Sequence, residues 1–242
     1  MTSYRPIERT TALLIGRSVD PSSIEIVKIL RARLQTGADS AGEVAEFHGG
    51  RVGDTVLEFE AVPEGRPFYH FALRVPRNRF AEAREWLASR SPLLSGRDGQ
   101  TTFEFDFWNA QACYALDPGD NIVELIAHRE LPDESAVEGP FGPDELLGVC
   151  EVGLVGPDTR AMAAALEPLG IELWSGTLDE PGGLAFMGGR DGVLILSEPD
   201  RGWIPTGRPA EIWPVEVDVA GSADAAVELH STPHRVSTVF PG

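Results

Sequence analysis

A histidine and a glutamate, two residue types that bind metal ions, lie in the middle of strand-like segments. In YHFALRV, strand alternation places His70 and Arg74 on one face and the large apolar residues on the other, which should pack against the helix that follows. In NIVELIA, the same alternation places Glu124 between Ile122 and Ile126, away from that helix. A carboxylate in apolar surroundings costs free energy unless a group of opposite charge compensates it. A divalent cation held by His70 and Glu124 would do so, and these ligands suit Zn, Fe, Mn, Co or Ni.

The elements that must position these residues follow a repeated order. The segments GDTVLEFEA (53–61) and GDNIVELIA (119–127) look alike, and Glu58 overlays Glu124. Strand-like segments also begin at Leu13, His70 and Glu151, and each precedes a helical pattern. These helical stripes are Ile26, Leu30 and Leu34; Phe80, Ala83 and Leu87; and Met162, Ala165, Leu166 and Leu169. Further strand-like runs come next, so each unit is predicted to be a βαβββ module.

A fourth module is predicted to be truncated. A strand-like segment at 212–221 is followed by the helix-prone run SADAAVEL, and the sequence then ends. The fold class is therefore α+β: three full modules and one truncated module, forming curled mixed sheets with helices on the outer face. The Pro- and Gly-rich stretch 131–144 is interpreted as a linker. It divides the chain into residues 1–130, a pair of modules with the candidate metal cup, and residues 145–242, a second, degenerate pair.

The segment HFALRVP…FAEAREWLASR…FEFDFWNAQACYALDPGDNIVELIAHR, residues 70–129, resembles the vicinal oxygen chelate superfamily. That group includes glyoxalase I, extradiol dioxygenases, fosfomycin-resistance enzymes and bleomycin-binding proteins. YALDPGDNIVELI is similar to the closing signature of the family. The resemblance implies a site on the concave face of a sheet made by paired modules. Metal ligands there would come from the first and last strand of each module.

These positions can be followed residue by residue. In the first pair they give Glu58, His70 and Glu124 as metal ligands, with Leu13 where a fourth ligand would lie. Glyoxalase-like members use four protein ligands and extradiol dioxygenases use His, His and Glu, so Leu13 weakens both comparisons. Glu58 could instead act as a general base. The second pair offers Glu151, Ile195 and Pro214 at the matching positions, and no metal is expected there.

Residues of the predicted substrate pocket lie close to this cup. They are Arg74, Phe107, Trp108, Asn109 and Tyr114, which would form an aromatic wall with a few polar groups. Asp117 and Asn121 are assigned to the turn before the closing strand. Trp203 is either a lid or, as we favour, a loop anchor. Cys113 and Cys150 lie in apolar runs and are interpreted as buried reduced thiols.

Two functions are compatible with this pattern. The first is a metal-dependent enzyme acting on a small oxygen-bearing substrate, by glyoxalase-like isomerase or lyase chemistry or by ring-cleaving dioxygenation. The alternative is a metal-free, bleomycin-resistance-like protein that sequesters a cationic aromatic compound, which the formal net charge of −18 would favour. The same charge argues against nucleic acid and membrane partners. A cytoplasmic location is expected, and a homodimer could cover the unpaired edge of the truncated module.

Overall fold

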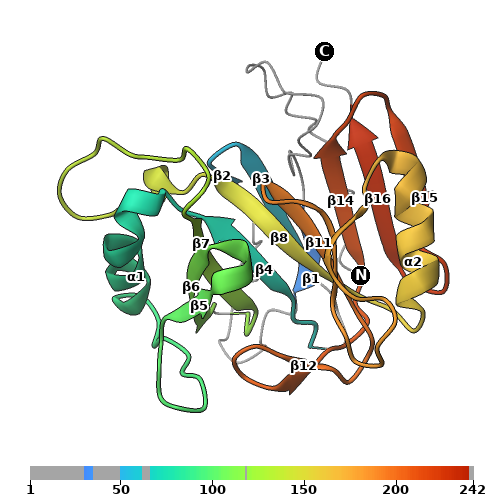
Figure 1. Cartoon of the computed structure of the whole chain (residues 1–242), viewed down its shortest axis with the longest axis horizontal. Helices are drawn as coiled ribbons and strands as arrows, with labels where there is room; N and C mark the ends of the chain where they lie inside the picture. The colour runs from blue at the N-terminus through green and yellow to red at the C-terminus, as the bar shows by residue number, and fades with distance from the viewer. Residues whose placement is uncertain (1–29, 35–49, 62–65, 118, 240–242) are drawn as a thin grey trace, which may run out of the picture.

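The structure is a computed structural model, and it describes residues 30–34, 50–61, 66–117 and 119–239. Two α-helices, α1 (Phe80–Ala88) and α2 (Thr159–Leu166), lie on opposite sides of the molecule with the strands between them (Figure 1). Their buried residues include Phe80, Ala83 and Leu87 in α1 and Met162 and Leu166 in α2, as the helical stripes predict. Neither helix is long and apolar enough to cross a membrane.

The second and third modules both have the predicted βαβββ order. The second consists of β4 (His70–Arg74), α1, β5 (Phe103–Phe105), β6 (Ala110–Leu116) and β7 (Ile122–His128). The third consists of β8 (Gly148–Val155), α2, β9 (Leu173–Gly176), β10 (Ala185–Gly189) and β11 (Gly192–Ser197). Together they form one eight-stranded sheet in the order β5-β6-β7-β4-β8-β11-β10-β9, in which the first strands β4 and β8 pair antiparallel.

The pairing of modules in this sheet differs from the pairing that the sequence predicts. The expected division at 130/145 separates the second module from the third, whereas the structure hydrogen-bonds them to each other through β4 and β8. The stretch 131–144 connects the two halves of that sheet. Glu145, the residue that follows this stretch, forms a buried ion pair with Arg79 of the second module. The physical reason is that β4 has an edge free of its own module, and β8 satisfies the hydrogen-bonding groups on that edge.

The remaining strands form smaller sheets. One has the order β1-β3-β2, made by β1 (Leu30–Leu34), β2 (Gly50–Val52) and β3 (Thr55–Ala61). Another has the order β14-β16-β15, made by β14 (Val215–Ala220), β15 (Ala225–Glu228) and β16 (His234–Val239). A two-stranded hairpin, β12 (Gly202–Trp203) and β13 (Arg208–Pro209), follows β11.

Two helix predictions are wrong in the described residues. Leu30 and Leu34 belong to β1, which pairs parallel with β3, and SADAAVEL contributes β15, which pairs antiparallel with β16. In both cases hydrogen bonding to a neighbouring strand overrides the local helical pattern. The fourth module therefore has three described strands. Leu13 and Ile26 lie outside the described residues.

The two faces of the large sheet carry different residues, as strand alternation predicts. Tyr69, Phe71 and Leu73 of the β4 segment pack in the same cluster as the buried residues of α1. Ala72, Ile122 and Ile126 belong to a second cluster on the concave face, together with aromatic side chains. The concave face is called the cup below. Cys113 and Cys150 are buried free thiols.

The turn that sets the register of β7 depends on Asn121. Its buried side chain accepts a hydrogen bond from the Tyr69 backbone N–H (2.9 Å) and donates one to Asp117 (2.8 Å), which confirms the predicted turn role. We expect Asn121→Ala to lower the free energy of unfolding by about 1–3 kcal/mol, because it leaves a buried N–H without an acceptor. Urea denaturation would measure this, with Asp98→Ala, in an exposed turn, as the control. Equal losses in the two variants would contradict the prediction.

Candidate metal centre

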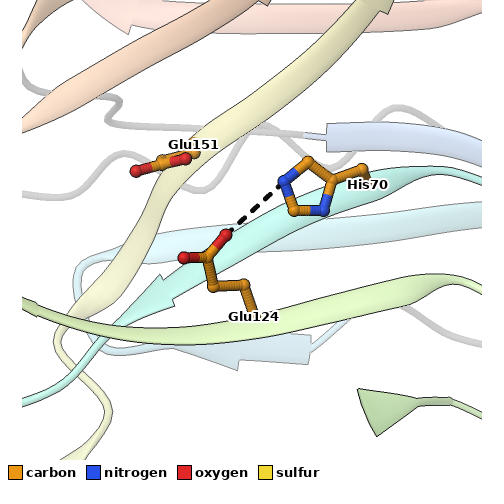
Figure 2. A group of neighbouring side chains, drawn as sticks. All are labelled: His70, Glu124 and Glu151. Carbon is orange, nitrogen blue, oxygen red and sulfur yellow. Dashed lines mark ion pairs between the residues drawn. The ribbon is translucent and has the colours of Figure 1, made fainter. Parts of the chain in front are cut away.

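Three ionisable side chains from neighbouring strands meet in the cup. His70 comes from β4, Glu124 from β7 and Glu151 from β8, and one ligand atom of each lies within 4.8 Å of the others (Figure 2). The register places Glu124 and Glu151 on either side of Ala72, whose small side chain leaves space between the two carboxylates. All three residues are buried, with exposed fractions of 6%, 2% and 3%.

A β-bulge helps to aim Glu151. Ala72 pairs with Glu151, but Leu73 pairs with Val149, so Cys150 is an extra residue in β8. The Cys150 thiol lies 3.6 Å from the Ala72 carbonyl oxygen, to which it donates a weak hydrogen bond. Bulges occur next to functional sites because they redirect side chains. Here Cys150 packs in the cluster of the concave face, and Glu151 points into the same space.

The orientation of His70 fixes which of its ring nitrogens faces the glutamates. Nδ1 lies 3.2 Å from the Ile122 carbonyl oxygen, which can only accept, so Nδ1 carries the proton. Burial lowers the pKa of His70 to about 4, so the ring is neutral at ordinary pH. The lone pair of Nε2 therefore faces Glu124 Oε2 at 3.5 Å. Two lone pairs at that distance repel each other unless a proton or a metal ion lies between them.

The two carboxylates need the same compensation. Burial, followed by the negative charge of Glu151, raises the pKa of Glu124 well above its ordinary value. Burial also raises the pKa of Glu151 to about 8. Glu151 Oε1 is buried and has no hydrogen-bond partner among the described residues. One neutral imidazole and two carboxylates with an unsatisfied oxygen form a donor set that fits a divalent cation, whose charge they would balance.

The second and third modules carry candidate ligand positions at equivalent places on their first and last strands. Comparing the two modules identifies a fourth such position. In the second module His70 pairs with Ile122, and Glu124 follows two residues later. In the third module Glu151 pairs with Val193, and Ile195 follows two residues later. Ile195 therefore corresponds to Glu124 and cannot bind a metal. Three ligands and one apolar position would leave coordination sites open for a substrate.

This arrangement also identifies the fold. Two βαβββ modules share one curled sheet through their first strands, and the candidate ligands lie on the first and last strands. This is the α+β arrangement with a curled mixed sheet that the resemblance of the sequence to the vicinal oxygen chelate superfamily implies. No protein-family model matches the sequence, and no curated protein matches it either.

The chain is similar in structure to several solved proteins. A glyoxalase I variant from Zea mays is 13% identical, covers 90% of this chain and 94% of its own, and has a TM-score of 0.47. A Bacillus subtilis protein assigned as a dioxygenase is 13% identical over 91% of this chain and 86% of its own, with a TM-score of 0.49. The 2,2',3-trihydroxybiphenyl 1,2-dioxygenase from Sphingomonas wittichii is 13% identical over 90% and 91%, with a TM-score of 0.29.

The observed fold separates the predicted metal ligands. It brings His70 and Glu124 together but places Glu58 in β3, in the separate β1-β3-β2 sheet. The group of converging ligands among the described residues contains Glu151 instead. The sequence pattern places Glu151 on the first strand of the third module, but it predicts that the second module pairs with the first module and not with the third. With the correct pairing, the same alignment would have placed Glu151 beside His70.

The predicted substrate residues lie in different surroundings. Tyr114 is buried beside Glu124, its register partner, whereas Phe107 is exposed. Arg74 forms ion pairs with Asp133 and Asp191. The remaining two also differ: Trp108 is buried against Trp174 and Phe186, and the Asn109 amide donates a hydrogen bond to Glu130 (3.4 Å).

Trp203, on the β12–β13 hairpin, packs against His70 of the candidate metal centre. Its ring lies 5.0 Å from the His70 ring, centroid to centroid, and only 4% of Trp203 is exposed. Gly153 makes this approach possible, since a Cβ there would come within 2.8 Å of the indole. Trp203 is thus anchored in the cup, as expected, and it also lies over a candidate ligand. A substrate would have to displace the hairpin or enter from another side.

Proposed function

We propose that this protein is a metal-dependent enzyme in which His70, Glu124 and Glu151 hold a divalent cation. The observation that carries this proposal is the convergence of these three side chains in a buried cup, with a histidine lone pair facing one carboxylate. The substrate would be a small molecule with two adjacent oxygen atoms. Isomerase, lyase and ring-cleaving dioxygenase chemistry are all within reach, and the identity of the ion would select among them.

The ion, when bound, would act as a Lewis acid toward the substrate oxygens. The protein would orient its ligands and exclude water. The Ile122 carbonyl holds the His70 ring so that Nε2 faces the cup. Burial and the nearby Glu124 raise the pKa of Tyr114 well above its ordinary value, so its hydroxyl stays protonated and can donate a hydrogen bond. Apolar neighbours such as Ile195 and Trp203 would keep solvent away from the reacting atoms.

Metal affinity tests the assignment directly. Calorimetric titration with Zn, Mn, Ni, Co or anaerobic Fe(II) should detect one ion per chain. We expect Glu124→Gln and Glu151→Gln to weaken binding more than about a hundredfold, because losing a ligand costs more than losing an outer-shell partner. The matched control is Glu58→Gln, which makes the same chemical change in a separate sheet and should leave the affinity unchanged.

The titration also separates this proposal from its alternatives. If Glu58→Gln weakens binding and Glu151→Gln does not, the ligand set is the one proposed from sequence and the structural assignment fails. If no ion binds to the parent protein, the metal-free binding function becomes the better account. A screen of cationic aromatic compounds would then be the appropriate measurement.

A further inference from the structure

A small cavity lies beside Trp203, where the β12–β13 hairpin meets the large sheet and the segment that leads into β14. Its walls come from segments that are distant in the sequence: the start of β4, β8, the hairpin, the residues before β14, and β16. The volume of the cavity is about 10 Å³, which is room for one group of the size of a water molecule. The fold therefore leaves a space that a small polar group can occupy.

His234 brings an unsatisfied hydrogen-bond acceptor to this cavity. The residue lines the cavity and is only 1% exposed. Its Nε2 lies 2.8 Å from the Val155 carbonyl oxygen, which can only accept, so Nε2 carries the proton. Burial lowers the pKa of His234, so the ring is neutral and Nδ1 keeps a lone pair. Nδ1 is buried and has no hydrogen-bond partner among the described residues, so a ligand with an N–H or O–H group would satisfy it.

Aromatic rings and a carboxylate give the cavity a preference for positive charge. Trp203 and Trp213 both line it, and the faces of aromatic rings attract cations. The exposed Glu211 also lines it, and its carboxylate accepts a hydrogen bond from the Trp213 indole N–H (2.7 Å), which holds the negative charge beside that ring. Phe68, another lining residue, already has a cation on its ring, because the Arg208 guanidinium lies 3.4 Å from the ring centroid.

We propose that this cavity binds the ammonium group of a small protonated amine. An ammonium group is about as large as a water molecule and carries three N–H donors, which the lone pair of His234 and the carboxylate of Glu211 would accept. The indoles of Trp203 and Trp213 would contact the charged group, and the carbon chain of the amine would extend toward solvent beside Glu211. The net charge of −18 would attract such a cation to the protein. This inference goes beyond the proposed function and does not depend on a metal ion.

Two ligands of nearly the same shape test the proposal. Both n-butylamine and n-butanol carry a hydrogen-bond donor at the end of the same chain, but only the amine is charged at neutral pH. Titration of the metal-free protein, followed by tryptophan fluorescence, reports binding because Trp203 and Trp213 line the cavity. We expect the amine to bind about tenfold or more tightly than the alcohol.

Three variants locate the binding site. Glu211→Gln should remove most of the preference for the amine, because the carboxylate supplies the opposite charge. His234→Phe should weaken binding of the amine about tenfold, because it removes an acceptor for a charged donor. The matched control is Glu216→Gln, which makes the same change in charge at an exposed residue of β14 and should keep the preference. Because Glu211 is exposed, its variant should fold as the parent does, and it decides the question if His234→Phe does not fold.

Equal affinities of the parent protein for n-butylamine and n-butanol would overturn the proposal. A preference for the amine that persists in Glu211→Gln would overturn it as well. Because the titration uses metal-free protein, its result is independent of whether His70, Glu124 and Glu151 bind a divalent ion.

Discussion

Raising the pH of the metal-free protein from about 6.5 to about 8.5 should lower its free energy of unfolding. Burial raises the pKa of both Glu124 and Glu151, so the folded state keeps protons that the unfolded state has already released. The stability that these two groups contribute is fully present below their pKa in the unfolded state. It is lost as the pH rises through their pKa in the folded state. The buried histidines His70, His128 and His234 have lowered pKa values, and their opposite contribution is mostly present at pH 6.5 and levels off about one pH unit higher.

The expected loss follows from the size of the shift. Burial raises the pKa of Glu151 from 4.5 to about 8, which lies about 1.5 units above the starting pH, and each unit corresponds to about 1.4 kcal/mol, so Glu151 alone contributes a decline of about 2 kcal/mol. Glu124, whose pKa is also raised, adds to this decline. A saturating divalent ion should remove this decline, because it binds the ionised carboxylates. Urea denaturation across the pH range, with and without metal, measures both effects.

The Glu151→Gln variant provides the control for this experiment. The amide that replaces the Glu151 carboxylate cannot ionise, so the Glu151→Gln variant lacks the negative charge that helps to raise the pKa of Glu124. The metal-free variant should therefore lose less stability than the parent over the same pH range. Added metal should then have a much smaller effect than in the parent. A parent protein whose stability is flat between these pH values would show that the two carboxylates are not held neutral in the folded state.

Replacing Trp203 with alanine should cause the largest loss of stability among the aromatic variants. The side chain is buried against Gly153 and the His70 ring, so its removal creates a cavity and should cost about 3–5 kcal/mol in unfolding free energy. Trp86→Ala is the matched control, because Trp86 is partly exposed on α1, where it packs against Phe141 and Arg90. Its loss should be clearly smaller.

The same variant tests whether Trp203 limits access to the cup. With the indole removed, the rate at which a divalent ion enters should rise, while His70, Glu124 and Glu151 remain in place. Stopped-flow mixing with a metal indicator would measure that rate. If Trp203→Ala is no less stable than Trp86→Ala and takes up metal at the parent rate, the indole does not close the site.

Sequence patterns predict those features of this protein that depend on local chemistry. Alternation along β4 and β7 predicts that His70 and Glu124 share the concave face, and helical spacing predicts the buried stripe of α1. The helical stripe of the third module likewise predicts that Met162 and Leu166 are buried, as they are in α2. Each of these features is determined by residues close together in the chain.

The features that sequence did not predict depend on contacts between distant segments. Which module pairs with which is decided by strand edges, and no residue of β4 indicates that β8 will lie beside it. The bulge at Cys150 leaves no signal that distinguishes it from regular alternation. The predicted ligand set therefore contains Glu58 in place of Glu151, although strand alternation indicates correctly which residues of β4 and β7 face the cup. The predicted homodimer remains a prediction.

The pairing of β4 with β8 also bears on how fast the protein unfolds. The candidate ligands are divided across this junction, His70 and Glu124 on one side and Glu151 on the other, so the site exists only after the two modules have docked. An ion bound there would act as a crosslink between two halves that are also joined by one strand pair, a connecting segment and side-chain contacts such as that of Trp108 with Trp174. Interactions that form after the folding transition state slow unfolding without accelerating folding. A bound ion would therefore contribute mainly to the lifetime of the folded protein.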